Sequence, residues 1–162
     1  LKKRPGSVEA GTAKNDEART AGEEDVYMHG ALTHEVLACA YEVHTVLGPG
    51  LLESAYRACM ERELRLRDLA YEAECPMPIR YKGEALDRGY RADLIIEGKV
   101  IVELEAVDKL LPIHYTQLFT YLRLTGLHVG LLINFNVSSL RNGIKRVVHK
   151  ARPEAALLPS TP

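Results

Sequence analysis

The most constraining feature of the sequence is the segment 91–107, RADLIIEGKVIVELEAV, in which two apolar runs flank the polar residues 97–99. A three-residue loop with a central glycine is a common β-hairpin connection, because glycine tolerates the left-handed backbone conformation that such loops need. In this register Asp93 lies directly opposite Glu103. The segment therefore predicts two antiparallel strands that carry facing carboxylates.

Alternation along the two strands separates an apolar face from an acidic face. The acidic face carries Asp93, Glu103 and Glu105, and the apolar face carries Leu94, Ile96, Val100, Val102 and Leu104. Carboxylates this close repel one another unless a raised pKa or a bound cation reduces their charge. Oxygen ligands of this kind suit Mg²⁺ or Mn²⁺. On spacing alone a solvated outer face of the hairpin stays open as the simpler interpretation.

The segments on either side of this hairpin predict an α/β domain. A helix with apolar residues at helical spacing ends before the glycines and proline at 48–50. The further elements are a helix over 51–68, strands over 72–81, 86–96 and 100–107, a helix from Pro112 to Gly126 and a buried strand over 127–135. The predicted order is α-α-β-β-β-α-β, and residues 136–150 stay unassigned.

Length and composition predict one domain over residues 28–150, because 162 residues suffice for a single hydrophobic core. Residues 1–27 mix charges with small residues and predict a disordered leader, and residues 151–162 predict a flexible tail. The net charge of −1 provides no overall positive field, so contact with nucleic acid would need a local basic patch. The widely spaced cysteines and the lack of a long apolar run favour a cytoplasmic protein that does not cross a membrane.

Several motifs resemble the PD-(D/E)xK nuclease superfamily and, more narrowly, the small bacterial GxxExxY proteins within it. The motif that gives the latter their name is present as GLLESAY over residues 50–56. The similarity extends from about His44 to Arg146 and includes YKGE, the hairpin segment, the helix with Gln117 and Tyr121, and LLINFNV. These motifs occur in order on the predicted elements and cover most of the domain.

This resemblance implies a restriction-endonuclease-like core, a mixed β-sheet flanked by helices, and Mg²⁺- or Mn²⁺-dependent hydrolysis of DNA. It makes Asp93 and Glu103 metal ligands, with the carbonyl of Leu104 as a third. The remaining residues that it implicates come from helices: Glu53 as an acidic residue of the first core helix, and Gln117 and Tyr121 as a Q-x-x-x-Y pair. Their i, i+4 spacing places the last two on one helix face.

The chain departs from the family at the catalytic strand, which reads Glu103-Leu104-Glu105 where E-x-K is usual. Glu105 cannot supply the positive charge that a lysine offers to a phosphate. It could instead act as a general base or an additional ligand, as E-x-E does in some restriction endonucleases of the superfamily. Alternatively another cation replaces the lysine, for which Arg91, Lys99 and Lys109 are nearest in sequence, and strand parity favours Arg91.

Other interpretations of these residues stay open. The fold could also persist without cleavage, as a protein that binds nucleic acid or a protein partner. Glu53 could simply pair with Arg57 one turn later, and Gln117 and Tyr121 could be a pair on a helix surface. Tyr56 fits the apolar stripe of its helix and is predicted to be a core residue. The DNA contacts predicted from charge are Arg91, Lys109, Lys145 and Arg146.

Overall fold

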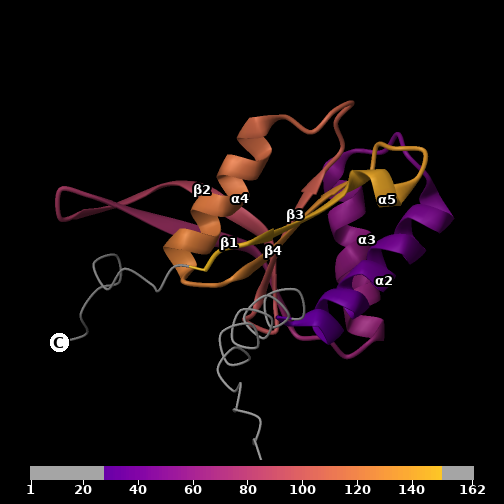
Figure 1. Ribbon diagram of the computed structural model, residues 1–162, viewed down its shortest axis with the longest axis horizontal. Coiled ribbons are helices and arrows are strands. Elements are labelled where there is room, and N and C mark those ends of the chain that lie inside the picture. Colours follow the sequence, from indigo (N-terminus) through magenta and orange to yellow (C-terminus); the bar gives the residue numbers. More distant parts are fainter. Residues whose placement is uncertain (1–27, 151–162) are drawn as a thin grey trace, which may run out of the picture.

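The computed structural model describes residues 28–150, so the predicted leader (1–27) and tail (151–162) lie outside the described residues. The elements in chain order are α2 (Gly30–Leu47), α3 (Glu53–Leu66), β1 (Tyr71–Tyr81), β2 (Glu84–Ile96), β3 (Val100–Glu105), α4 (Pro112–Thr125), β4 (Val129–Asn134), α5 (Leu140–Gly143) and β5 (Ile144–Val148) (Figure 1). The predicted order is confirmed as far as β4. The structure adds α5 and β5 in the part that the sequence left unassigned.

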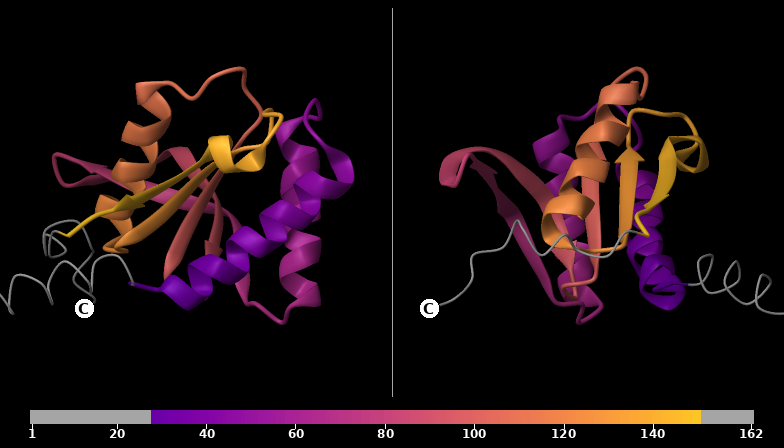
Figure 2. Two further views of the ribbon diagram at one scale, coloured as in Figure 1. Left: turned by 45° about the vertical axis from the view of Figure 1, so that its right-hand side comes forward. Right: turned by 60° about the vertical axis from the view of Figure 1, so that its left-hand side comes forward.

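The five strands form one mixed sheet in the order β1-β2-β3-β4-β5, in which only β3 and β4 are parallel. Helices α2 and α3 cover one face of the sheet and α4 covers the other (Figure 2). The strand β4 is buried along its whole length, as its continuous apolar sequence predicts. Within residues 28–150, no helix has both the length and the apolar character needed to cross a membrane.

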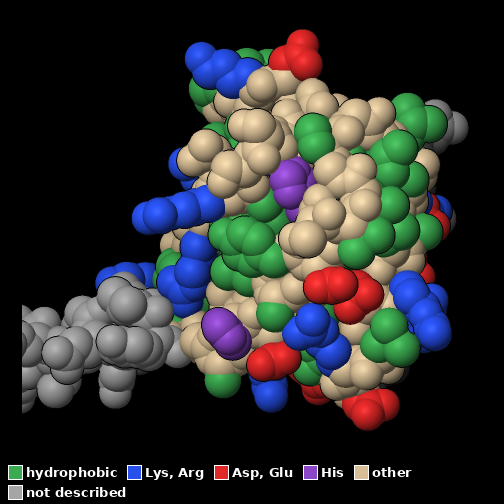
Figure 3. Space-filling model, turned by 90° about the vertical axis from the view of Figure 1, so that its right-hand side faces the viewer, with side chains coloured by type: hydrophobic (Ala, Val, Ile, Leu, Met, Phe, Trp, Pro, Cys, Tyr) green, Lys and Arg blue, Asp and Glu red, His purple; other side chains and the backbone are tan. Residues whose placement is uncertain are grey.

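Each helix buries residues spaced one turn apart. In α3 these are Tyr56, Met60 and Leu64, which pack on the sheet face that α3 shares with α2. Helix α4 lies very close to the sheet. This is evident at Gly130 of β4, where an added Cβ would come within 2.6 Å of the Leu118 side chain of α4. This close approach determines how far side chains of α4 reach toward neighbouring β3. The face over α2, α3 and α5 mixes hydrophobic side chains with charges of both signs (Figure 3).

The predicted hairpin register is confirmed between β2 and β3, where Ile96 pairs with Val100 and Leu94 with Val102. Strict alternation is wrong beyond Leu94. Ala92 packs in the cluster beneath α4, whereas Leu94 packs in the cluster beneath α2 and α3. Two residues of one regular strand would share a face. The strand therefore rotates at the intervening Asp93.

The backbone opposite Asp93 accounts for this rotation. Glu74 of β1 has φ 49°, a left-handed conformation that interrupts a regular strand. The recorded β1–β2 pairs pass from Ala73–Leu94 to Cys75–Ala92 without a pair between Glu74 and Asp93. Asp93 thus occupies an irregular position in β2, where its side chain is free to bond backbone groups of a neighbouring strand.

Candidate metal and nucleic-acid site

Two hydrogen bonds between side chains and backbone connect Asp93 with Glu103 and with the next residue, Leu104. The backbone N–H of Asp93 donates to Glu103 Oε1 at 3.1 Å, and the backbone N–H of Leu104 donates to Asp93 Oδ2 at 2.8 Å. These two bonds take the place of a backbone ladder where the recorded pairing of β2 with β3 stops. The predicted proximity of the two carboxylates is therefore present, although it arises from an interrupted ladder and not from a regular strand pair.

Glu103 is buried and Asp93 partly buried, and the two carboxylates have different neighbours. Glu103 is 4% exposed, so the alternative of a solvated acidic face is wrong for this residue. On the α3 side, Arg57 Nη1 lies 3.2 Å from Asp93 Oδ1, and its Nη2 lies 3.4 Å from Glu74 Oε1. On the α4 side, Gln117 Nε2 donates to Glu103 Oε2 at 3.4 Å. Asp93 thus has a cation beside it, whereas Glu103 has a neutral amide.

Burial and mutual repulsion raise the pKa values of this cluster. The pKa of Glu103 rises to about 8, first because the carboxyl is buried and second because Asp93 lies beside it. Burial also raises the pKa of Asp93, although the Leu104 N–H and Arg57 act in the opposite direction. The pKa values of Glu53 and Glu105 are raised by burial and by the charge of Asp93. All four carboxylates are therefore close enough to affect one another.

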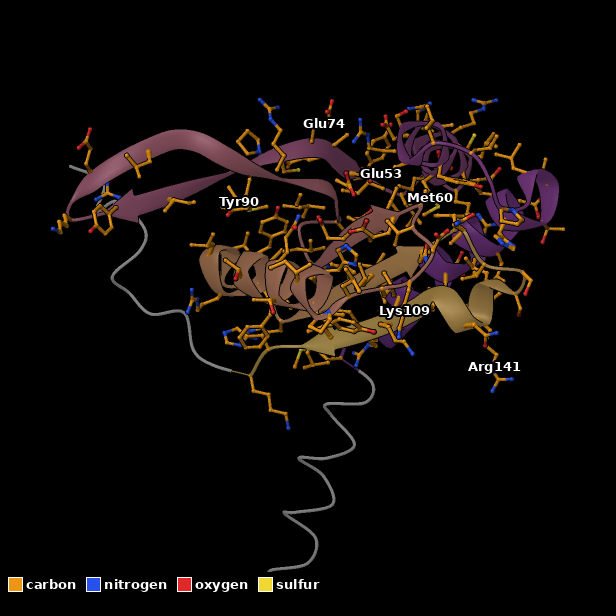
Figure 4. All side chains as sticks on the ribbon, turned by 90° about the horizontal axis from the view of Figure 1, so that it is seen from above. Glu53, Met60, Glu74, Tyr90, Lys109 and Arg141 are labelled. Carbon is orange, nitrogen blue, oxygen red and sulfur yellow. The ribbon has the colours of Figure 1, made fainter. Side chains whose placement is uncertain are left out.

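Glu53 is the first residue of α3 and owes its place to Tyr56. The buried Tyr56 hydroxyl donates to the carbonyl of Gly48 at 2.6 Å and accepts the N–H of Leu51 at 3.1 Å. Its ring stacks on Phe135 at 4.4 Å between centroids. These contacts fasten the turn before α3 to the core, and they confirm Tyr56 as a core residue. Figure 4 shows Glu53 at the start of its helix, on the side nearest the β1–β2 hairpin.

Arg57 forms its ion pairs with Asp93 and Glu74 and not with Glu53 one turn earlier, although its charge still acts to lower the pKa of Glu53. No hydrogen bond or ion pair of the Glu53 side chain occurs among residues 28–150. Its side chain is exposed near three further carboxylates. An unpaired carboxylate at this place remains available to an additional ligand.

Gln117 and Tyr121 act as a unit on the inner side of α4. Gln117 Nε2 also donates to the Tyr121 hydroxyl at 2.9 Å, and that hydroxyl donates to the carbonyl of Arg91 at 3.3 Å. Tyr121 is 1% exposed, so the alternative of a helix surface pair is wrong. Burial, and then the charge of Glu103, raise the pKa of Tyr121 to about 12. The tyrosine therefore stays protonated at neutral pH and orients Gln117 toward Glu103.

Asn134 fixes the chain that follows Glu105, a role that the sequence interpretation missed. Its Oδ1 accepts the Val107 N–H at 3.1 Å, and its Nδ2 donates to the Val107 carbonyl at 2.7 Å. The N–H of Phe135 donates to the Glu105 carbonyl at 2.8 Å. Asn134 is 2% exposed at the end of an otherwise apolar strand. That single polar residue in LLINF was the available signal, since a buried amide needs partners.

The cation nearest the carboxylates is Arg57, which was not among the candidates proposed from sequence. Arg91, the substitute favoured by strand parity, donates instead to the Glu74 carbonyl at 3.5 Å and is exposed. No ion pair between Arg91 and a carboxylate occurs in residues 28–150. Arg57 lies 36 positions before Asp93 in the chain. Only the packing of α3 against the sheet brings them together.

The other predicted basic residues lie on separate parts of the molecule. Lys99 belongs to the loop between β2 and β3, at the opposite end of β3 from Glu103. Lys109 is exposed in the segment between β3 and α4 (Figure 4). Lys145 and Arg146 lie on β5, which β4 separates from β3, and Arg146 donates to the carbonyl of Met28 at 2.8 Å. Lys109 is therefore the one of these four that follows directly from the strand carrying Glu103.

The donor set fits a hard divalent cation in its chemistry. Asp93 and Glu103 offer carboxylate oxygens in a buried place with surplus negative charge, which is the environment that Mg²⁺ and Mn²⁺ neutralise. Within the described part of the chain, no three His, Cys, Asp or Glu side chains already converge on one ion position. Two carboxylates together with backbone oxygen and water are nevertheless a usual environment for Mg²⁺, which keeps several waters.

Comparison with known protein families gives one match. Residues 30–147, more than half of the 162-residue chain, match a family model described as the PD-(D/E)XK nuclease superfamily. Neither the curated proteins nor the solved structures include a match to this chain. The matched range begins at α2 and ends within β5, so it includes all the carboxylates described above.

Proposed function

Because the chain belongs to the PD-(D/E)XK nuclease superfamily, we propose that it hydrolyses phosphodiester bonds of DNA with the help of Mg²⁺ or Mn²⁺. The observation that carries this proposal is the pair of Asp93, partly buried, and Glu103, buried, held together through backbone N–H groups with the guanidinium of Arg57 bonded to Asp93. A fold that buries two adjacent carboxylates loses stability unless positive charge arrives. Such an arrangement is typical of a site that binds a cation and an anionic substrate.

In this proposal Asp93 and Glu103 hold the metal, and Glu53 and the Leu104 carbonyl complete the protein ligands. When bound, the cation supplies a nucleophilic water and neutralises charge on the phosphate. Gln117 keeps Glu103 in place through its 3.4 Å contact, and Tyr121 orients Gln117 through the 2.9 Å bond. Both act as positioning residues.

The missing lysine has two partial replacements. We assign to Arg57 the electrostatic part, because its guanidinium is partly exposed, at 22% of its side chain, beside Asp93. A guanidinium there can bind a phosphate oxygen while it stays bonded to the carboxylate. We assign to Glu105 the role of general base, since a carboxyl with a raised pKa accepts a proton from an attacking water more readily than an ordinary one.

We further propose that the chain is one of the GxxExxY proteins. The geometry of residues 50–56 supports this assignment: Gly50 has φ 103°, a conformation that favours glycine. Tyr56 bonds back to the same turn, and Glu53 between them begins α3 near the carboxylates. In this proposal the motif brings its glutamate near Asp93 through a turn that the hydroxyl of Tyr56 stabilises.

A titration of Mg²⁺ and Mn²⁺ during cleavage of single- and double-stranded DNA tests the proposal. The wild type is compared with Asp93→Ala, Glu105→Lys and the control Glu42→Ala, which removes an exposed carboxylate from α2. We expect metal-dependent cleavage by the wild type and the control, and none by Asp93→Ala. Absence of metal binding in every variant would refute the proposed metal site.

The competing function is a nuclease fold that binds nucleic acid or a protein partner without cutting. Glu105 favours it, because a carboxylate stands where a lysine is usual and Arg57 already bonds two carboxylates. In that case Asp93→Ala retains binding, and binding weakens with salt through Lys and Arg contacts. Cleavage by Glu105→Lys alone, with an inactive wild type, would identify a decayed enzyme and refute the proposed activity.

A further inference from the structure

The outer parts of β1 and β2 form a ribbon that is separate from the rest of the sheet. β2 pairs with β3 only over Leu94–Ile96, whereas its pairs with β1 continue to the Tyr81–Glu84 pair at the tip. We call residues 76–91 the arm. Figures 1 and 4 show the arm extending beyond the end of α4 and away from the helices. From Met77 to the tip it spans about 17 Å, at roughly 3.3 Å per residue.

The tip of the arm is a tight turn at Lys82 and Gly83. Both residues have positive φ, 51° and 85°, as two-residue hairpin turns between right-twisted strands require. Such a turn keeps the ribbon narrow up to its end. The width of a two-stranded ribbon suits the major groove of B-form DNA, which is about 12 Å wide. The major groove of A-form RNA is too narrow for side chains to enter.

The described charged side chains of the arm are mostly positive. Arg80, Lys82 and Arg91 are exposed, whereas Glu84 is the acidic residue among the described side chains of the arm. Among the side chains that the structure describes, neither Arg80 nor Lys82 takes part in an ion pair. The arm therefore offers positive charge that the fold itself does not neutralise.

Aromatic side chains are exposed along the same ribbon. Tyr81 is 61% exposed beneath the ammonium of Lys82, which lies 5.3 Å from its ring centroid, and Tyr90 is 51% exposed. Tyrosine combines an apolar ring with a polar hydroxyl, and it is enriched at interfaces for that reason. Together with the neighbouring cations these tyrosines match the phosphates, sugars and base edges of a nucleic acid.

The base of the arm is connected to the proposed catalytic site. The Tyr90 ring lies edge-on to Tyr121 at 6.1 Å, and Tyr121 continues through Gln117 to Glu103. Figure 4 shows Tyr90 between the arm and α4. A duplex lying along the arm would thus have its backbone led toward the carboxylates.

Pairing of the arm with a second copy of the chain is less suitable. Pro76 and Pro78 lack the backbone N–H groups that an added strand would need on β1. The cations at the tip would also repel their equivalents in a second arm.

From these observations we propose that the arm binds double-stranded DNA by entering the major groove, with Arg80 and Lys82 on backbone phosphates. This proposal rests on the proposed function only for the identity of the polymer, because the arm can bind without any cleavage.

Its test measures binding of the wild-type chain to a fluorescent duplex of about 20 base pairs in EDTA, where no metal-dependent cleavage occurs, over about 50 to 200 mM NaCl. The double variant Arg80→Ala/Lys82→Ala removes two positive charges from the arm. Arg62→Ala/Arg141→Ala removes two exposed positive charges from the α3 and α5 side and serves as the matched control. Thermal unfolding of both variants checks that they fold as the wild type does.

We expect the arm variant to bind the duplex at least tenfold more weakly and to reduce the slope of log affinity against log salt by about 2, because each phosphate contact contributes about 0.9. The control variant should bind as the wild type does. An arm variant that binds like the control would overturn the proposal, as would equal affinity of the wild type for duplex RNA or single-stranded DNA. Arm-dependent binding in EDTA, together with no cleavage of the duplex when Mg²⁺ or Mn²⁺ replaces EDTA, would support the arm proposal and reject hydrolysis. Metal-dependent cleavage that the arm variant leaves unchanged would support hydrolysis and reject the arm proposal.

Discussion

Replacing Glu103 by glutamine should stabilise the metal-free protein at alkaline pH. The pKa of Glu103 is about 8 in the folded chain and 4.5 when the side chain is in water. A carboxyl whose pKa is raised by folding does not destabilise the folded state at pH values below its pKa in water. The loss of folding free energy grows as the pH rises from that pKa toward the pKa in the folded chain. At about 1.4 kcal/mol per unit, ionisation of Glu103 costs on the order of 4 kcal/mol at pH 8.

Glutamine removes this cost and keeps much of the geometry. Its side-chain oxygen can still accept the N–H of Asp93, and rotation of the Gln117 amide can restore their mutual contact. We therefore expect Glu103→Gln to raise the free energy of unfolding by roughly 2 to 4 kcal/mol at pH 8 in EDTA, with little gain near pH 5.

The assay is urea denaturation in EDTA between about pH 6.5 and 8, a range above the titration of His29, whose lowered pKa gives the opposite slope. The wild type should lose about 2 kcal/mol across this range through Glu103. Glu103→Gln should show a flatter profile, and the exposed control Glu42→Gln should follow the wild type. Added Mg²⁺ should stabilise the wild type much more than Glu103→Gln. A wild-type profile that Glu103→Gln leaves unchanged would refute the idea that buried charge destabilises this site.

Three further substitutions test how the site is held. Gly130→Ala should lower the free energy of unfolding by about 1 to 3 kcal/mol in urea denaturation, because its Cβ would meet Leu118 at 2.6 Å. Tyr56→Phe should cost about 1 to 3 kcal/mol in the same assay, since the Gly48 carbonyl loses its 2.6 Å partner. Arg57→Gln should reduce kcat by a factor of about 10² or more, because Arg57 is proposed to act on the phosphate. Calorimetry should show that the variant still binds Mg²⁺. An unchanged kcat would reject the proposed role of Arg57.

The hairpin was predictable because its signals are local. The glycine at position 98 and the apolar runs beside it determine the loop and the register, and the structure has the predicted pairs from Ile96–Val100 to Leu94–Val102. What alternation could not predict is the rotation at Asp93. It depends on the left-handed backbone of Glu74, which lies on another strand. A glutamate in that conformation has no distinctive sequence pattern.

The last strand was unassigned for a related reason. In β5, Ile144 packs with the cluster beneath α2 and α3, and Val147 packs with the cluster beneath α4. An edge strand that is half-buried on both faces has neither clear alternation nor a continuous apolar run. Its existence follows from antiparallel pairing with β4 and not from its own composition.

The partners of the carboxylates were the least predictable part of the site. Helical spacing suggested Glu53 as the partner of Arg57, a contact between residues one turn apart. The guanidinium instead bonds Asp93 and Glu74, because α3 packs against β3 and β1. Contacts of this kind depend on how a helix lies on a sheet, which local patterns do not encode.

The charge balance of the proposed metal site is compatible with Glu105 at the position where a lysine is usual. When all are ionised, the four interacting carboxylates of Glu53, Asp93, Glu103 and Glu105 carry four negative charges, and among the described residues the guanidinium of Arg57 is the cation that forms an ion pair with one of them. With a lysine at position 105 the surplus would fall from three negative charges to one, and a divalent cation would then leave the site positive. With Glu105 the same cation leaves one negative charge, so attraction for the metal is stronger while attraction for the phosphate is weaker. Positive charge for the substrate must then come from Arg57, as proposed above, and from cations outside this cluster.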